Sequence, residues 1–336
     1  MSDILLELKN LTVSIRRDKE DIPIVKGVDI AIPRGKIVGL VGESGCGKSM
    51  TAKSVMGILP GAARVSFGSI LWHDPDGTVT DLTGLKEKEL RKMCGTKIGM
   101  VFQEPMTSLN PMMRIGDQVA EVLLIHKLVK NRSEARDKVI QLLNEVGIPE
   151  PELRYRSYPH ELSGGMRQRV MIAMALACEP DILIADEPTT ALDVTIQAQI
   201  LELMKSLQTE LGMAIIMITH DLGVVAQMCD EVIVMYAGAI CEQGSADEIF
   251  YNPCHEYTKG LLRSIPTADG GKERLKPITG TPIDLLNMPK GCAFAPRCDA
   301  AMRICLKEKC ERMQINDLHA AACWMNVKKN MEGGEA

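Results

Sequence analysis

The chain has 336 residues and a formal net charge of −5, from 39 lysines and arginines against 44 aspartates and glutamates. This length suits one large domain with an extension, or two domains. The mildly acidic balance gives no general basic face of the kind that binds nucleic acid, so we expect no nucleic-acid partner.

The hydrophobic pattern argues against a membrane-spanning chain. The longest apolar run, residues 170–178, is far shorter than the roughly 18 residues needed to cross a bilayer. The N-terminus lacks the basic start and long apolar stretch of a signal peptide. We therefore expect a cytosolic protein whose contact with a membrane is peripheral.

The N-terminal part of the chain predicts strands. Residues 5–15 alternate apolar and polar side chains, and residues 24–32 form a second strand-like stretch. Residues 37–41 are a short β-branched run that suits a strand buried on both faces.

The remaining chain predicts a helical insertion followed by alternating strands and helices. Helical periodicity dominates from about residue 104 to 170, as in residues 118–125 and 137–146. Strands that alternate with helices imply a parallel sheet with helices on its faces. Residues 267–271 have linker composition. The later strands are predicted at residues 182–185, 214–218 and 231–236.

A glycine-rich loop follows the third predicted strand and opens a predicted helix. Its glycines let backbone N–H groups curl around phosphate oxygens, and the helix N-terminus favours an anion. We predict that Lys48 reaches the β- and γ-phosphates of ATP and that the Ser49 hydroxyl binds Mg²⁺. The alternative is a plain glycine-rich turn, which the Lys-Ser pair disfavours. The loop fits the eight-residue Walker A pattern: Gly42, Glu43, Ser44, Gly45, Cys46, Gly47, Lys48 and Ser49.

Two carboxylates follow the predicted strand at residues 182–185. A carboxylate at the end of a central parallel strand lies in the crevice where ligands bind. We predict that Asp186 holds Mg²⁺, directly or through water, and that Glu187 polarises the attacking water. An acidic helix cap is the alternative. We interpret Cys46 in the glycine-rich loop as a small side chain that tolerates the turn, in preference to a redox group.

Four further motifs make the chain similar to the ATP-binding-cassette (ABC) proteins over about residues 5–265. Gln103 resembles the residue of their Q-loop, and His220 resembles their switch histidine. Asp193, in Ala191-Leu192-Asp193, resembles the D-loop. The signature motif is represented by Leu162, Ser163, Gly164 and Gly165.

This resemblance implies a P-loop NTPase of the ABC ATPase type. The fold it implies is an α/β fold with a RecA-like parallel-sheet core, an antiparallel β subdomain, a helical insertion and a small Cys-rich C-terminal extension. Two such subunits bind two ATP molecules in a head-to-tail dimer, where each signature motif faces the γ-phosphate held by the opposite subunit.

The resemblance also implies roles for single residues. His220 contacts the γ-phosphate and orients the water beside Glu187. Gln103 senses Mg²⁺ and links the site to the helical insertion, and Asp193 couples the two sites. The aromatic residue that usually stacks on adenine is replaced here by Ile15, followed by two arginines, so no residue is assigned to the base.

Longer stretches resemble the ATPases of dipeptide, oligopeptide and nickel importers. They are residues 102–111, 158–169 and 186–195, with a C-terminal pattern that starts at Gly291. The resemblance implies three segments: a nucleotide-binding domain at 1–265 with a helical subdomain at about 104–170, a linker at 266–280, and a Cys-rich extension at 281–336.

The importer resemblance also implies partners. They are a second, related ATPase subunit, so that the dimer is a heterodimer, and two integral-membrane permease subunits. An external solute-binding protein acts indirectly. The chain is then a peripheral protein on the cytoplasmic face of the cell membrane, and the solute is a di- or oligopeptide, or nickel or a related solute.

Cysteines crowd the last fifth of the chain. Their spacing lacks the tight C-x₂-C pair of structural zinc sites, and four thiolates on a loop-rich segment suit a [4Fe–4S] cluster. The resemblance implies a cluster on Cys292, Cys298, Cys305 and Cys323. A Cys₃His zinc site that uses His319, or an unligated set of thiols, stays open as an alternative. Cys310 is an extra thiol able to substitute for a ligand.

Two other function classes compete with the importer ATPase. A soluble cassette ATPase that acts on nucleic acid or ribosomes usually carries two cassettes or long coiled-coil insertions, which this sequence lacks. A regulatory iron–sulfur protein that only binds ATP has no need of Glu187 and His220. Both comparisons favour an ATP-hydrolysing importer subunit.

Overall fold

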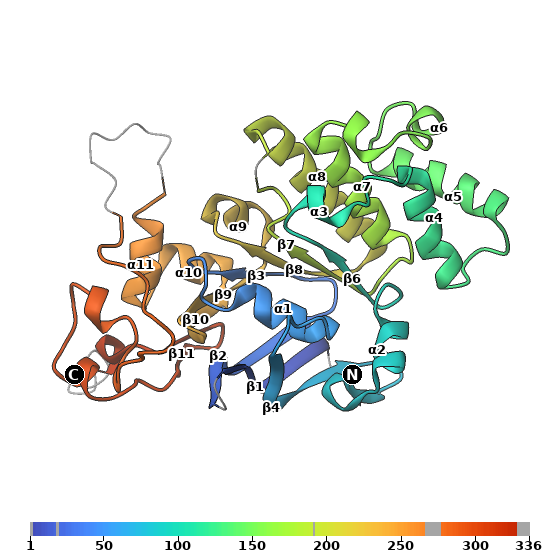
Figure 1. Ribbon diagram of the computed structural model, residues 1–336. Coiled ribbons are helices and arrows are strands. Elements are labelled where there is room, and N and C mark those ends of the chain that lie inside the picture. The colour runs from blue at the N-terminus through green and yellow to red at the C-terminus, as the bar shows by residue number, and fades with distance from the viewer. Residues whose placement is uncertain (1–2, 18–19, 191, 266–276, 328–336) are drawn as a thin grey trace. The chain divides into compact units, whose positions relative to one another are not determined.

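The computed structural model describes residues 3–17, 20–190, 192–265 and 277–327. These residues form two compact units (Figure 1), which divide at 32–36, at 83/84 and at 218/219. Ala191 of the predicted D-loop and residues 266–276 of the predicted linker lie outside the described residues. The domain boundaries that the sequence suggests stay predictions.

The first unit contains an antiparallel sheet with the strand order β2-β1-β4-β5. The alternation predicted for residues 5–15 is interrupted at Asn10, whose φ of 47° is left-handed. The pairing of β1 with β4 shifts register there, and Gly68 faces the bulge because a Cβ atom at that position would lie 2.3 Å from Asn10 O. The strands are β1 (Ile4–Arg17), β2 (Glu20–Pro33), β4 (Ala63–His73) and β5 (Val79–Asp81).

A second, mixed sheet of this unit positions the glycine-rich loop. Its strand order is β11-β12-β10-β9-β3; β3 and β9 are parallel, and β10 is antiparallel to β9 and β12. All five residues of β3 are buried, as predicted for a strand covered on both faces. The strands are β3 (Ile37–Val41), β9 (Glu231–Tyr236), β10 (Ala239–Ser245), β11 (Met313–Asn316) and β12 (His319–Ala321).

Short helices complete the first unit. Helix α1 begins directly after the glycine-rich loop, and α10 and α11 carry the chain from β10 toward the extension. The helices are α1 (Lys48–Met56), η1 (Leu82–Gly84, at the border of the units), α9 (Leu222–Met228), α10 (Ala246–Tyr251), α11 (Glu256–Leu262), η3 (Ala295–Arg297) and η4 (Ile304–Leu306).

The second unit contains three parallel strands and the helical insertion. The strand order is β8-β7-β6, with β7 parallel to both neighbours. The strands β6 (Ile98–Val101), β7 (Ile182–Asp186) and β8 (Ala214–Thr219) are fully buried. The helices are α2 (Glu87–Met93), α3 (Pro105–Ser108), α4 (Ile115–Ile125), α5 (Arg132–Glu145), α6 (Pro151–Arg154), η2 (Pro159–Glu161), α7 (Gly164–Leu176) and α8 (Val194–Leu211).

Helix α5 begins earlier than the periodicity at residues 137–146 indicates. Its N-cap is Asn131, whose side chain accepts hydrogen bonds from Ser133 N and Glu134 N. An Asn followed three residues later by Glu is a recognisable start signal.

Across the described ranges no helix is long and apolar enough to cross a membrane.

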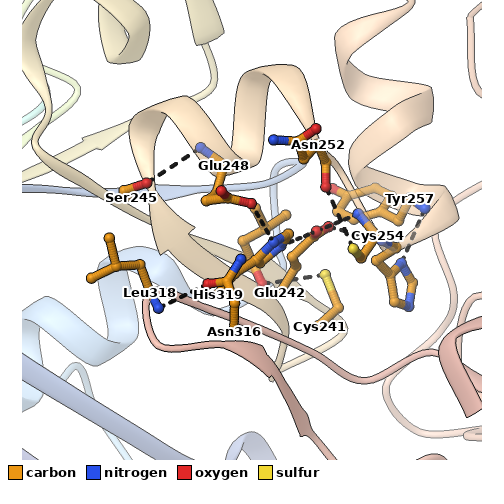
Figure 2. Close-up of polar contacts among 12 residues, drawn as sticks. Cys241, Glu242, Ser245, Glu248, Asn252, Cys254, Tyr257, Asn316, Leu318 and His319 are labelled. Carbon is orange, nitrogen blue, oxygen red and sulfur yellow. Dashed lines mark hydrogen bonds and ion pairs between the residues drawn. The ribbon is translucent and has the colours of Figure 1, made fainter. Parts of the chain in front are cut away.

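The C-terminal extension joins the first unit through a buried ion pair (Figure 2). His319 on β12 places Nε2 2.7 Å from Glu242 Oε1 on β10 and Nδ1 3.1 Å from Glu248 Oε2. The exposed fraction of the side chain is 1% for His319 and 0% for Glu242. Gly244 gives the ring room, because a Cβ atom there would lie 3.2 Å from His319 Cδ2.

Both members of this pair have shifted pKa values. The hydrogen bond to Glu242 raises the pKa of His319, against the effect of burial. Burial alone would raise the pKa of Glu242, but hydrogen bonds from His319 and from the backbone N–H groups of Cys254 and His255 outweigh it and lower the pKa. Both shifts favour the charged forms, an imidazolium paired with a carboxylate.

We predict that His319→Gln destabilises the chain by about 3–5 kcal/mol near neutral pH, because it leaves Glu242 buried without its counter-charge. The ion pair contributes its full stability at a pH below the pKa of His in the unfolded chain, about 6.5. Because the pKa of His319 is raised in the folded chain, this contribution is lost as the pH rises through the folded-state pKa. The difference in Tm between wild type and variant should therefore shrink at alkaline pH. Thermal unfolding from pH 6 to pH 9.5 measures it.

The control for this experiment is Glu87→Gln, which breaks the exposed Arg91–Glu87 ion pair on α2 and should leave the Tm unchanged. A Tm difference for His319→Gln that stays constant or grows with pH would contradict the ion-pair account.

Candidate active site

The glycine-rich loop between β3 and α1 takes a shape that only glycine permits at two positions. Gly42 has φ 149°, and a Cβ atom there would lie 2.3 Å from the carbonyl oxygen of Met235. Gly47 has φ 107° and is the N-cap of α1. These turns and the helix that begins at Lys48 give the loop the form expected of an anion site.

Lys48 places its ammonium group inside this loop. Only 5% of the residue is exposed, and Nζ donates hydrogen bonds to Gly42 O at 2.6 Å and to Glu43 O at 3.0 Å. Ser49 follows it in the first turn of α1. Cys46 is buried, and burial raises the pKa of its thiol, which fits the packing role inferred from the sequence.

His220 also belongs to the first unit. It lies between Thr219 at the end of β8 and Asp221, the N-cap of α9. Asp221 Oδ1 accepts a hydrogen bond from Gly223 N at 2.8 Å, and Asp221 N donates to Thr219 Oγ1 at 3.0 Å. These bonds fix the backbone on the C-terminal side of His220, and His220 itself is exposed.

The second unit brings Gln103 and Glu187 together. Gln103 Nε2 donates to Glu187 Oε2 at 3.0 Å, and Thr190 Oγ1 donates to the same oxygen at 2.9 Å. Asp186, the last residue of β7, has an exposed fraction of 2%. The second unit thus holds the buried carboxylate of Asp186 next to the partly buried carboxylate of Glu187, which two side chains orient.

The backbone of Glu187 takes a conformation that side chains disfavour. Its φ is 49°, and its N–H donates to Ile218 O at 2.8 Å. Left-handed non-glycine residues cost roughly 1–3 kcal/mol and cluster at functional sites. Neither this strain nor the contact with Thr190 was inferred from the sequence, although Thr190 lies only three residues beyond Glu187.

The signature and D-loop residues meet at the N-termini of α7 and α8. Ser163 caps α7 by accepting from Met166 N, and Asp193 caps α8 by accepting from Ile196 N at 2.9 Å. Gly165 allows the two helices to approach, because a Cβ atom there would lie 2.7 Å from Ile196 Cγ2. A Cβ atom at Gly164 would be in ordinary contact with Leu192 Cδ2, at 3.7 Å, and Leu162 is buried just before the helix.

Comparison with known proteins connects these features. Residues 25–190 match the family model described as ABC transporter. The chain belongs to the ABC transporter family. The predicted family and the ABC ATPase cassette fold are therefore confirmed, and the chain is an ATPase of this class. A second model, described as oligopeptide/dipeptide transporter, C-terminal region, matches residues 241–305, which include three of the five cysteines of the extension.

Relatives that match nearly the whole chain are named as peptide-transport ATP-binding proteins. The chain is 50% identical to a dipeptide transport ATP-binding protein of Bacillus subtilis, over 97% of this chain and 96% of the relative. It is 52% identical to an oligopeptide transport ATP-binding protein of the same organism, over 98% of both chains.

Solved structures resemble the cassette part of the chain. A dimeric ATP-binding cassette in a post-hydrolysis state bound to ADP and Pi has a TM-score of 0.63 and 29% identity, and covers 72% of this chain and 99% of that chain. A protein from Clostridium perfringens that is part of the ABC transporter complex cbiONQ has a TM-score of 0.62 and 31% identity, over 75% of this chain and 92% of that chain.

We predict that Glu187→Gln lowers kcat for ATP hydrolysis by about 10²–10⁴-fold, because the amide cannot polarise the attacking water. ATP binding should persist, since Lys48 and the loop are unchanged. Single-turnover hydrolysis and equilibrium binding of ATP measure the two effects separately. Thr209→Val, on the exposed face of α8, is the control and should hydrolyse ATP normally. Residual turnover above a tenth of wild type would contradict the assignment of Glu187.

Proposed function

We propose that the chain is the ATP-hydrolysing subunit of an importer for di- and oligopeptides. The observation that carries this proposal is the similarity to peptide-transport ATP-binding proteins over nearly the whole chain, extension included. The match of residues 241–305 to the model described as oligopeptide/dipeptide transporter, C-terminal region, favours the peptide group.

The proposed ATP site uses the residues that the sequence motifs indicate. Lys48 and the N–H groups of residues 42–49 bind the phosphates, and Ser49, Asp186 and Gln103 hold Mg²⁺. The buried carboxylate of Asp186 and the amide of Gln103 are oxygen donors of the kind that Mg²⁺ prefers. Mg²⁺ supplies charge neutralisation at the phosphates. Glu187, oriented by Gln103 and Thr190, polarises water, and His220 contacts the γ-phosphate.

The proposed dimer places the signature motif of one subunit against the nucleotide of the other. Support comes from the capped N-terminus of α7, which presents Ser163, Gly164 and Gly165 as a second anion site. The similar solved cassette is dimeric in its ADP- and Pi-bound state. The partner is a second, related ATPase subunit, which makes the dimer a heterodimer.

The proposed surface for the permease subunits is the helical insertion near residues 103–125. Large apolar side chains are exposed there: the exposed fraction is 83% for Met112 and 66% for Ile125. Exposed apolar side chains of this size favour a docking surface for another protein. Through this contact the chain would lie on the cytoplasmic face of the membrane, while an external solute-binding protein delivers the peptide.

We also propose that the extension holds a [4Fe–4S] cluster on Cys292, Cys298, Cys305 and Cys323. The backbone of Cys292 donates to Cys305 O at 2.8 Å, and Gly291 permits this approach because a Cβ atom there would lie 2.2 Å from the same oxygen. Backbone hydrogen bonds oppose the rise in pKa that burial causes in three of these thiols, which favours the thiolate form that a cluster needs: those of Phe294 and Ala295 for Cys292, Ala300 for Cys298, and Met325 and Glu256 for Cys323.

A single zinc ion fits these thiols less well. Zinc–sulfur bonds of about 2.3 Å require ligand sulfurs within about 4 Å of one another. Within the described part of the chain, no three thiols of the extension have sulfurs that close. Burial raises the pKa of Cys298 and of Cys310 to about 11, so ligation must displace protons. Cys310 and Cys292 both border a cavity of about 220 Å³, which keeps Cys310 available as a substitute ligand.

The importer proposal is tested by ATPase activity of the assembled complex in lipid vesicles. We expect peptide-loaded solute-binding protein to raise kcat several-fold, because peptide delivery favours the closed dimer. Solute-binding protein without peptide and a Met112→Asp variant of the chain are the controls, and neither should give full stimulation. Stimulation by a nickel chelate in place of peptide would contradict the proposed solute.

The cluster proposal is tested by anaerobic purification followed by an absorption spectrum and assays of iron, sulfide and zinc. We expect a broad visible band with matching iron and sulfide, which Cys298→Ser abolishes and Cys254→Ser preserves. Zinc without sulfide, or no metal at all, would contradict a cluster in the extension.

A further inference from the structure

The C-terminal extension contacts the Walker A loop through one side chain. Arg297 Nη1 lies 2.6 Å from Glu43 Oε2, and Nη2 lies 2.8 Å from Glu43 Oε1. This is a bidentate ion pair between residues 254 positions apart in the sequence. The exposed fraction of the side chain is only 5% for Arg297 and 25% for Glu43, so solvent screens the pair weakly.

Other contacts hold Arg297 ready for this pair. Its Nε donates to Thr279 O at 3.0 Å, and Nη1 lies 3.4 Å from the hydroxyl of Tyr236. The guanidinium carbon is 5.9 Å from the centre of the Tyr236 ring. The hydrogen bonds to Glu43 raise the pKa of Arg297. A guanidinium fixed by several partners loses little side-chain entropy when it forms a bidentate pair.

The backbone of Glu43 is held from the same side. Its N–H donates to the hydroxyl of Tyr257 at 2.8 Å. Tyr257 is fully buried, and its ring lies 4.7 Å from that of Tyr236 and 5.3 Å from that of Phe294 in the extension. The extension thus contacts the Glu43 side chain directly through Arg297, and its Phe294 packs on the tyrosine that holds the Glu43 main chain.

A second contact borders the loop. Residues 43–46 line a cavity of about 90 Å³ together with Pro282, Ile283 and Leu285 of the extension. The extension therefore meets the loop along several residues, and Arg297 is the charged element of this contact.

The charge of Glu43 has a consequence for nucleotide binding. A carboxylate in a loop that binds a triphosphate repels the ligand, and the repulsion is strong where solvent is partly excluded. Arg297 neutralises this carboxylate and fixes the direction in which it points. We propose that Arg297 is a positioning residue of the ATP site, and that the C-terminal extension sets the nucleotide affinity of the chain through Glu43.

The test is binding of a non-hydrolysable ATP analogue to the full-length chain, measured by calorimetry for four proteins: wild type, Arg297→Met, Glu43→Gln and the double variant. We expect Arg297→Met to weaken binding about tenfold, because the phosphate loop then carries an unpaired carboxylate. The double variant should bind at least as tightly as Arg297→Met, since the carboxylate that Arg297 neutralises is gone.

The matched control is Arg312→Met. Arg312 is another arginine of the extension and donates to Gln243 Oε1 at 2.8 Å, so its loss should leave binding within twofold of wild type. Arg297→Lys keeps the charge but loses the bidentate geometry, so it should weaken binding about threefold. This variant replaces Arg297→Met in the experiment if the Met variant does not fold. In the assembled complex, Arg297→Lys should raise KM for ATP with little change in kcat.

Two results would overturn the proposal. One is unchanged affinity in a folded Arg297→Met or Arg297→Lys variant. The other is a double variant whose loss of affinity equals the product of the losses in the two single variants, because Arg297 would then act independently of Glu43. Neither result bears on the importer proposal, since nucleotide binding by the ABC cassette does not depend on which solute is transported.

Discussion

Backbone N–H groups surround a triphosphate only where the chain turns through conformations that side chains disfavour. Gly42 and Gly47 meet this constraint, with φ angles of 149° and 107°. The turn requires a buried strand before it and a helix after it, which β3 and α1 supply. The backbone of Met235 closes around Gly42 so tightly that no side chain fits there, so β9 is part of the same constraint.

The second unit uses the same principle at helix N-termini and at a strand end. Ser163 and Asp193 cap α7 and α8, and Glu187 holds a left-handed backbone after β7. Side chains stabilise the unpaired N–H groups of the two helices, and the carbonyl oxygen of Ile218 accepts the N–H of the strained Glu187. The residues of the chemistry thus lie where regular structure ends, while the buried strands behind them keep those ends in place.

Much of the cassette could be predicted from the sequence because its signals are local. The run at residues 37–41, the glycines after it and the acids after β7 depend on neighbours in the chain. The rest depends on contacts between distant residues. The bulge at Asn10 needs Gly68, and the ion pair of Glu43 needs Arg297, 254 positions away. No periodicity in the sequence indicates such pairs.

The extension shows the same limit. Strand β12 of the extension pairs with β10, and His319 on β12 bonds to Glu242 on β10. These contacts hold the Cys-rich segment against the rest of the first unit. Arg297 directly precedes Cys298, so the segment that we propose to hold a cluster is also the one that reaches the phosphate loop. The sequence indicated a separate extension, and the structure adds the contacts that make it part of the nucleotide-binding unit.

Transport itself tests the central claim most directly. The complex containing this chain would be placed in vesicles with ATP on the side of the chain, and a labelled dipeptide with its solute-binding protein on the other side. The account predicts that peptide accumulates on the ATP side and that accumulation stops without ATP. Movement of peptide away from the ATP side, or no ATP-dependent movement of any peptide, would contradict it.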